Sequence, residues 1–189
     1  GERPTGLYIP RFRNLEGQEP AEFLRGYGYQ TGAQRIDWRA RFNQAGIGAK
    51  YKDTMRKPWF WAWGLSGFGE NLPQKRNRLY LSSNKKDSYG IPQVVFDMEW
   101  GDNDRKIRED ASKQATRLLR AAGAALVLPS PPKLSRPGEG IHEMGTARMA
   151  DDPREAVLNK YNQAHDVPNL FISDGSFMTS SSCVNPSLT

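Results

Sequence analysis

Cysteine and histidine are scarce in this chain. Its 189 residues hold one cysteine, Cys183, and two histidines, His142 and His165. One cysteine excludes a disulfide within the chain, and three such side chains cannot assemble the usual Cys/His metal cluster. No metal site is therefore predicted, and each histidine can be considered individually.

Long apolar runs and runs of basic residues are also absent. No apolar stretch approaches the roughly 18 residues of a membrane span, and residues 1–4 do not read as a signal peptide. The net charge is +6, but basic residues alternate with acidic ones, as in 102–109. This pattern favours a solvated surface and disfavours a nucleic-acid partner.

A phosphate-binding loop is missing. Gly67 and Gly69 supply the first two glycines of a G-x-G-x-x-G motif, but Leu72 stands at the third position. The segment also lacks the strand-then-helix context of that motif. We therefore do not expect the chain alone to bind a nucleotide cofactor tightly.

The aromatic and glycine-rich stretches predict strands. Residues 7–9, 58–69, 78–81 and 92–98 read as strands, with a polar turn over 82–90. Strands joined by short turns predict a mostly antiparallel sheet. The glycines of 23–29 suit a close backbone approach or ordinary sheet packing, and the tryptophans of 58–69 suit a core strand or a sugar-binding surface.

One helix is expected from residue 102 onward. Apolar residues recur there at helical spacing, Asp102 or Asn103 can cap the start, and Gly123 ends the run. A brief strand is expected over 126–128, and the Pro- and Gly-rich residues 129–140 read as a loop or boundary. The predicted fold class is therefore α+β.

Residues from 141 onward carry the groups suited to chemistry. His142 in IHEMGTARM can take a proton from a hydroxyl. Residues 167–172 read as a turn that leads into a buried strand, and Asp174 follows its C-terminal end, where an acidic side chain can bind a ribityl hydroxyl or simply form an Asx turn. Asn185 precedes Pro186, which suits the first turn of a helix.

The order H-x-x-G-T-x-x-M, V-P-N-L-F-I-S-D-G-S and N-P-S-L-T, over about 141–189, resembles the C-terminal signature of glucose–methanol–choline oxidoreductases. These are FAD enzymes that oxidise alcohols and sugars. Upstream, RGYGYQ, GFGENLP and NRLYL are similar to the substrate domain of sugar-oxidising members, especially bacterial glucoside 3-dehydrogenase-like proteins. The resemblance implies oxidation of a sugar or glycoside CHOH group, such as C3, to a ketone.

The resemblance also implies roles for individual residues. His142 matches the catalytic base, and Asn185 matches the second catalytic position, which is His in some members and Asn in others. The positions that contact FAD are matched by Asp174, Gly175, Asn185, Pro186 and Ser187, and the candidates for contact with the sugar are Gln30 and Trp61.

The implied organisation is a fragment of a larger two-domain fold. Residues 1–140 would form a substrate-binding domain with a mostly antiparallel sheet and a flanking helix, and 141–189 would supply C-terminal elements of a Rossmann-like FAD domain. The N-terminal dinucleotide-binding half would come from the remainder of the parent chain. The electron acceptor would be oxygen, a quinone, or a small or cytochrome subunit, and the location would be the periplasm or alternatively the cytoplasm. The rival hypothesis is a non-enzymatic carbohydrate- or protein-binding domain.

Overall fold

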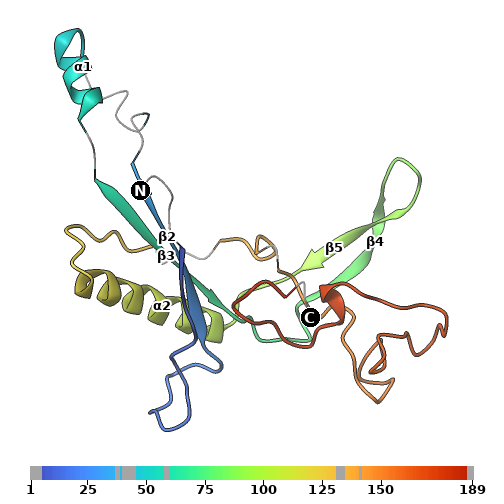
Figure 1. The fold of residues 1–189 in the computed structure, drawn as a ribbon. Coiled ribbons are helices and arrows are strands. Elements are labelled where there is room, and N and C mark those ends of the chain that lie inside the picture. Colours follow the sequence, from blue (N-terminus) through green and yellow to red (C-terminus); the bar gives the residue numbers. More distant parts are fainter. Residues whose placement is uncertain are drawn as a thin grey trace.

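The computed structural model describes residues 6–36, 39, 46–57, 60–130, 135–140 and 142–186. Its elements follow the chain as strands β1 to β3, a hairpin, a long helix and an irregular C-terminal segment (Figure 1). Their bounds are β1 Gly6–Ile9, β2 Tyr27–Arg35, α1 Ala49–Arg56, β3 Trp61–Gly69, β4 Arg78–Lys86, β5 Pro92–Asp97, α2 Asp102–Ala121 and the 3-10 turn η2 Gly175–Phe177. The predicted α+β class with antiparallel strands is confirmed.

Strands β1, β2 and β3 form an antiparallel sheet with β2 in the middle. Tyr8 pairs with Gln30, and Gln30 pairs with Ser66, so these three side chains point to the same face. Tyr27 and Tyr29 point to the opposite face, which α2 covers (Figure 1).

Two glycines of β3 allow α2 to lie close to the sheet. A methyl group at Gly69 would lie 2.8 Å from Cγ2 of Ile107, and one at Gly67 would lie 3.4 Å from Cβ of Ala111. The resulting core is small and aromatic, with edge-to-face contact between Tyr27 and Tyr29. The glycine-rich sequence of this strand therefore serves helix packing.

The N-cap of helix α2 lies one residue before the first predicted cap, Asp102. Gly101 is the N-cap, and its N–H donates to Oδ2 of Asp104 at 2.7 Å. At the other end Gly123, with φ of 85°, donates its N–H to the carbonyl of Arg120. The prediction that Gly123 ends the helix is confirmed.

Other parts of the chain differ from the sequence-based expectations. Strand β4 continues through residues predicted to form a turn, and residues 126–128 form no strand. Within 167–172 the expected turn forms at 168–169, but no buried strand follows it: Phe171 is 59% exposed and makes a single isolated bridge, to Gln163. Helix α1 was not predicted, because its eight residues bury no side chain and carry no strong apolar pattern.

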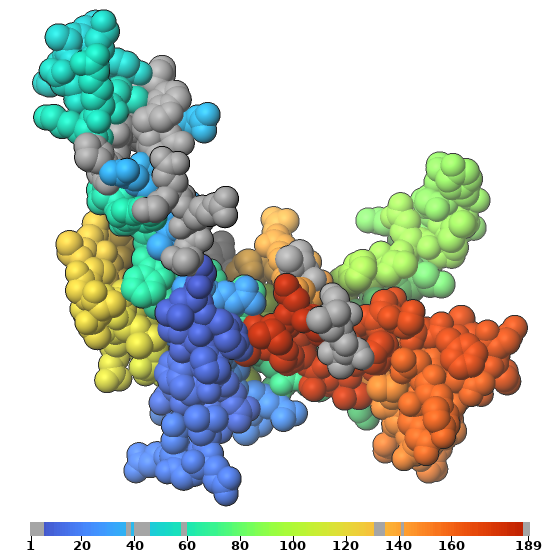
Figure 2. Space-filling view, in the orientation of Figure 1, coloured from blue at the N-terminus to red at the C-terminus, as the bar shows by residue number. Residues whose placement is uncertain are grey.

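The hairpin of β4 and β5 projects away from the three-stranded sheet (Figures 1 and 2). Its apolar side chains are largely exposed, including Leu81 and Phe96. A groove of about 440 Å³ runs between β3 and α2 and is also lined by Trp100 and Leu128. This groove lies on the face of the sheet that α2 covers, and Gln30 points to the opposite face.

A half-buried cluster of Arg13, Tyr27 and Asp110 links the segment before β2 to α2. Asp110 accepts hydrogen bonds from the Tyr27 hydroxyl at 2.5 Å and from Arg13 Nε at 2.8 Å. Burial, followed by the bond to Asp110, raises the pKa of Tyr27, so its hydroxyl remains a donor.

Replacing Asp110 with alanine is expected to destabilise the three-stranded sheet and its helix by about 1–3 kcal/mol, because the buried Tyr27 hydroxyl loses its acceptor. Thermal unfolding measures this as a lowered Tm. Glu99→Ala is the control, since its ion pair with Arg76 is exposed and contributes about 0–1 kcal/mol. Equal Tm losses in the two variants would contradict the assignment.

Candidate active site

The H-x-x-G-T segment turns at Gly145, whose φ is 81°. This left-handed conformation favours glycine, and a methyl group there would also lie 3.2 Å from the carbonyl oxygen of Met178. Two residues later, the Ala147 N–H donates to the carbonyl of Ser176 at 2.9 Å. The structure therefore joins this turn directly to the D-G-S turn, almost thirty residues further along the chain.

Asp174 begins the D-G-S turn as the N-cap of η2. Its Oδ1 accepts from the Ser176 N–H at 2.8 Å and from the Ser176 hydroxyl. These bonds lower the pKa of Asp174, so the carboxylate stays ionised. The residue is exposed, and Oδ2 accepts no hydrogen bond within the described residues.

Gly175, the other residue of this turn that was predicted to contact FAD, packs against the Met144 side chain. A methyl group at Gly175 would lie 2.5 Å from Sδ of Met144. The Met144 side chain therefore occupies the space that any larger residue at position 175 would need.

His142 lies half-buried at the start of the first turn. Its imidazole makes no hydrogen bond within the described part of the chain, so both ring nitrogens remain available. His165 differs, because its Nε2 lies 3.1 Å from the carbonyl oxygen of Ala150. This contact favours a structural role for His165.

The segment from Ser180 to Pro186 lies on the open face of the sheet, where Figure 2 shows the C-terminal residues against the N-terminal strands. Cys183 Sγ lies 2.8 Å from the Tyr8 hydroxyl, and the Cys183 carbonyl accepts from Gln30 Nε2 at 3.3 Å. The Ser181 N–H donates to Glu70 at 3.4 Å. Asn185, two residues after Cys183, is exposed and its amide is unengaged by the described residues.

The two candidate sugar contacts lie on opposite faces of the sheet. Gln30 faces the C-terminal segment, and its Oε1 accepts no hydrogen bond within the described residues. Trp61 pairs with Arg35 and, by strand alternation, faces the α2 side; it is 49% exposed. Only Gln30 is placed beside the Asn185 segment.

The structure assembles some predicted residues and leaves others apart. Asp174 and Gly175 lie beside the His142 turn, while Asn185 and the half-buried Pro186 lie on the sheet. No hydrogen bond joins the His142 and Asn185 side chains among the described residues. Ser187 lies outside the described residues.

Sequence reasoning missed Tyr8, Gly28 and Cys183 as neighbours of the site. Strand pairing brings Tyr8 beside Gln30, and Cys183 lies two residues before Asn185. The glycine in RGYGYQ was the available signal, since it suits a close approach of another segment.

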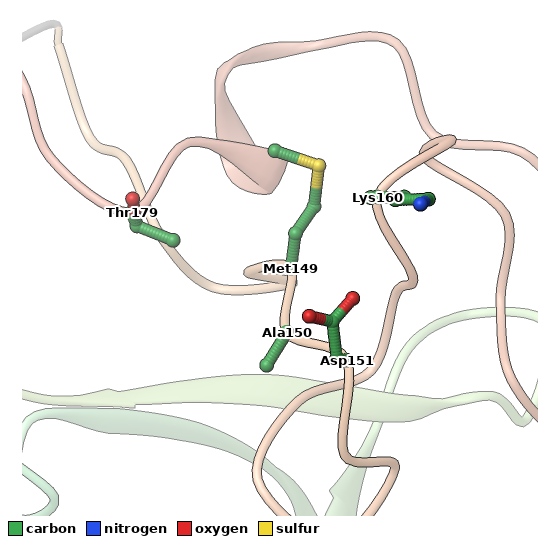
Figure 3. Close-up of a pocket in the computed structure, with 5 residues that line it drawn as sticks. All are labelled: Met149, Ala150, Asp151, Lys160 and Thr179. Atoms are coloured by element: carbon green, nitrogen blue, oxygen red, sulfur yellow. The ribbon is translucent and has the colours of Figure 1, made fainter.

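A shallow hollow of about 290 Å³ lies beside these turns (Figure 3). It is lined by Met149, Ala150, Asp151, Lys160 and Thr179. In this view Lys160 lies to the right of the Met149 side chain, Asp151 lies below it and Thr179 lies to its left. Neither His142 nor Asn185 lines it, so the hollow is separate from the proposed catalytic pair.

The described residues contain neither a cluster of potential metal ligands nor a candidate membrane-spanning helix. No group of three or more potential metal ligands occurs among those residues. No helix there is both long enough and apolar enough to cross a membrane.

Comparisons with known proteins show which family this chain resembles. The family model described as GMC oxidoreductase matches residues 73–189. The chain is 38% identical over 122 residues to 2-methyl-1,2-propanediol dehydrogenase of Mycolicibacterium austroafricanum, covering 65% of this chain and 22% of the relative.

Two further relatives are named for reactions on sugars. C-glycoside 3-oxidase of Arthrobacter globiformis is 31% identical over 67% of this chain and 24% of its own length. The fructose dehydrogenase large subunit of Gluconobacter japonicus is 30% identical over 76% of this chain and 26% of its own length. The chain thus spans about a quarter of these relatives. Because the family match includes both joined turns and the Asn185 segment, the resemblance seen in the tail is confirmed, and the chain belongs to the GMC oxidoreductase family.

Proposed function

We propose that the complete protein containing this chain is an FAD-dependent oxidoreductase that converts a sugar or glycoside CHOH group, such as C3, to a ketone. One observation carries the proposal: the segment with Asn185 lies on the open sheet face to which Gln30 points. Family membership supports it, as do relatives named C-glycoside 3-oxidase and paromamine 6'-oxidase.

The residues present fit the flavin that GMC enzymes use. The exposed, ionised Asp174 has one carboxylate oxygen available to accept a hydrogen bond from a cofactor hydroxyl. Pro186 has no N–H and so needs no acceptor, and the Asn185 amide is exposed. When bound, FAD supplies the acceptor for the hydride that leaves the substrate carbon.

Three residues of this chain then take part in the reaction. His142 takes the hydroxyl proton as the C–H bond breaks and the C=O bond forms. Asn185 donates an amide hydrogen to the same oxygen, which gains negative charge as its proton leaves. Gln30 accepts from a neighbouring hydroxyl of the sugar through Oε1 and so orients the ring.

The same proposal includes an electron acceptor and a location. A separate small or cytochrome subunit would receive the electrons, and the relative named as a large subunit supports a multi-subunit arrangement. A periplasmic location is proposed with it, on the family resemblance alone.

The test is an absorbance spectrum of the complete protein before and after a glycoside is added without oxygen. We expect a flavin band that bleaches on addition of the sugar, because two electrons reach the cofactor. A polyol such as 2-methyl-1,2-propanediol, added at the same concentration, tests the substrate class. Absence of flavin would contradict the proposal and favour a binding domain.

A further inference from the structure

The short loop before Asn185 is fastened to the substrate-domain sheet at a few defined points. Tyr8 contacts the Cys183 thiol at 2.8 Å, and Gln30 donates to the Cys183 carbonyl at 3.3 Å. Ser181 donates to Glu70 at 3.4 Å. We call these contacts the Cys183 clasp.

Gly28 makes room for the clasp. A methyl group at this position would lie 2.9 Å from Cys183 Sγ and 3.3 Å from the Tyr8 hydroxyl. The thiol and the Tyr8 hydroxyl therefore both lie close to the backbone of β2 at Gly28. A side chain at position 28 would push the loop away from the sheet.

The clasp fixes the backbone close to Asn185. Two residues of extended chain span only about 7 Å, so holding Cys183 restricts where Asn185 can lie. The contact with Cys183 also raises the pKa of Tyr8, which keeps its hydroxyl protonated and able to donate. Tyr8 lies far from Asn185 in the sequence, but it thus helps to fix the position of Asn185 through Cys183.

We propose that Tyr8 is a positioning residue for Asn185 and acts through Cys183. The inference rests on the proposed function, because Asn185 is given its catalytic task there. It predicts that losing the Tyr8 hydroxyl affects the chemical step and leaves sugar binding nearly unchanged.

The first test is a double-mutant cycle in the complete, flavin-bound protein. Tyr8→Phe is expected to lower the limiting rate of flavin reduction about five- to tenfold, with the Kd for the glycoside unchanged. In an Asn185→Ala background the same change is expected to have no further effect. Equal factors in both backgrounds would show a general structural role and overturn the proposal.

Matched variants separate the hydrogen bond from the side chain. Cys183→Ser keeps a hydrogen-bonding group for Tyr8 and is expected to retain most of the rate, whereas Cys183→Ala should match Tyr8→Phe. Tyr80→Phe removes a hydroxyl from the projecting hairpin, where Tyr80 is 45% exposed, and is expected to change nothing.

A second readout does not need turnover. Alkylation of the Cys183 peptide, followed by mass spectrometry, is expected to be several-fold faster in Tyr8→Phe, because the thiol is released from the sheet. Unchanged alkylation would overturn the clasp even in an active enzyme. Failure of the unaltered protein to reduce its flavin would instead count against the proposed function alone.

Discussion

Replacing His142 with alanine in the complete protein is expected to slow flavin reduction by a glycoside about 10²- to 10⁴-fold, while FAD remains bound. The hydroxyl proton must leave as the C=O bond forms, and His142 offers ring nitrogens that the described residues do not occupy. Stopped-flow absorbance of the flavin band under anaerobic conditions measures the rate. The flavin-to-protein ratio measures retention of the cofactor.

The control is the other histidine. His165 lies against the carbonyl oxygen of Ala150, and His165→Gln preserves a donor for that carbonyl. This variant should reduce its flavin at a nearly normal rate. A normal rate in His142→Ala would remove His142 from the mechanism, and a loss of FAD in that variant would reassign it to cofactor binding.

The sequence predicted elements wherever local chemistry determines the backbone. Gly123 ends α2 because the left-handed conformation there favours glycine. The aromatic stretch 61–69 forms β3, and its glycines correspond to close helix packing at Ile107. These signals are local and depend little on the rest of the fold.

The failures occurred where tertiary contacts decide the structure. The apolar run around Phe171 reads as a buried strand, yet the described chain provides only one bridge for it, and its side chain remains exposed. Of the turn expected over 82–90, residues 87–90 do form a turn, but 82–86 belong to β4, which pairs with β5 again at Lys86 after a register shift. Strand length in a hairpin depends on the partner, which one segment cannot reveal.

In the candidate site, too, the local motifs could be read from the sequence, whereas the contacts between distant segments could not. The motifs made His142, Asp174 and Asn185 candidates, and the joined turns place Asp174 beside the His142 segment. Spacing could not tell that Gln30 and Trp61 face opposite sides of the sheet, since that depends on the strand register. It also could not tell that Cys183 would contact Tyr8, 175 residues away.

Asn185 is expected to contribute the second-largest catalytic effect. Removing its amide in Asn185→Ala should lower the limiting rate of flavin reduction about 10²- to 10³-fold, because the substrate oxygen loses a donor as its charge develops. The Kd for the sugar should change much less, since this interaction strengthens mainly in the transition state. Anaerobic stopped-flow titration with the glycoside separates the two quantities.

Two further replacements distinguish donation from mere occupancy of the site. Asn185→Asp preserves the size but replaces the amide donor with a carboxylate, so it should be at least as slow as Asn185→Ala. Asn185→His provides a ring N–H and matches the alternative residue of the family, so it should retain much of the rate. An active Asp variant with an inactive His variant would contradict hydrogen-bond donation, and Asn185 would then act by shape alone, as a side chain whose size keeps the substrate carbon in place.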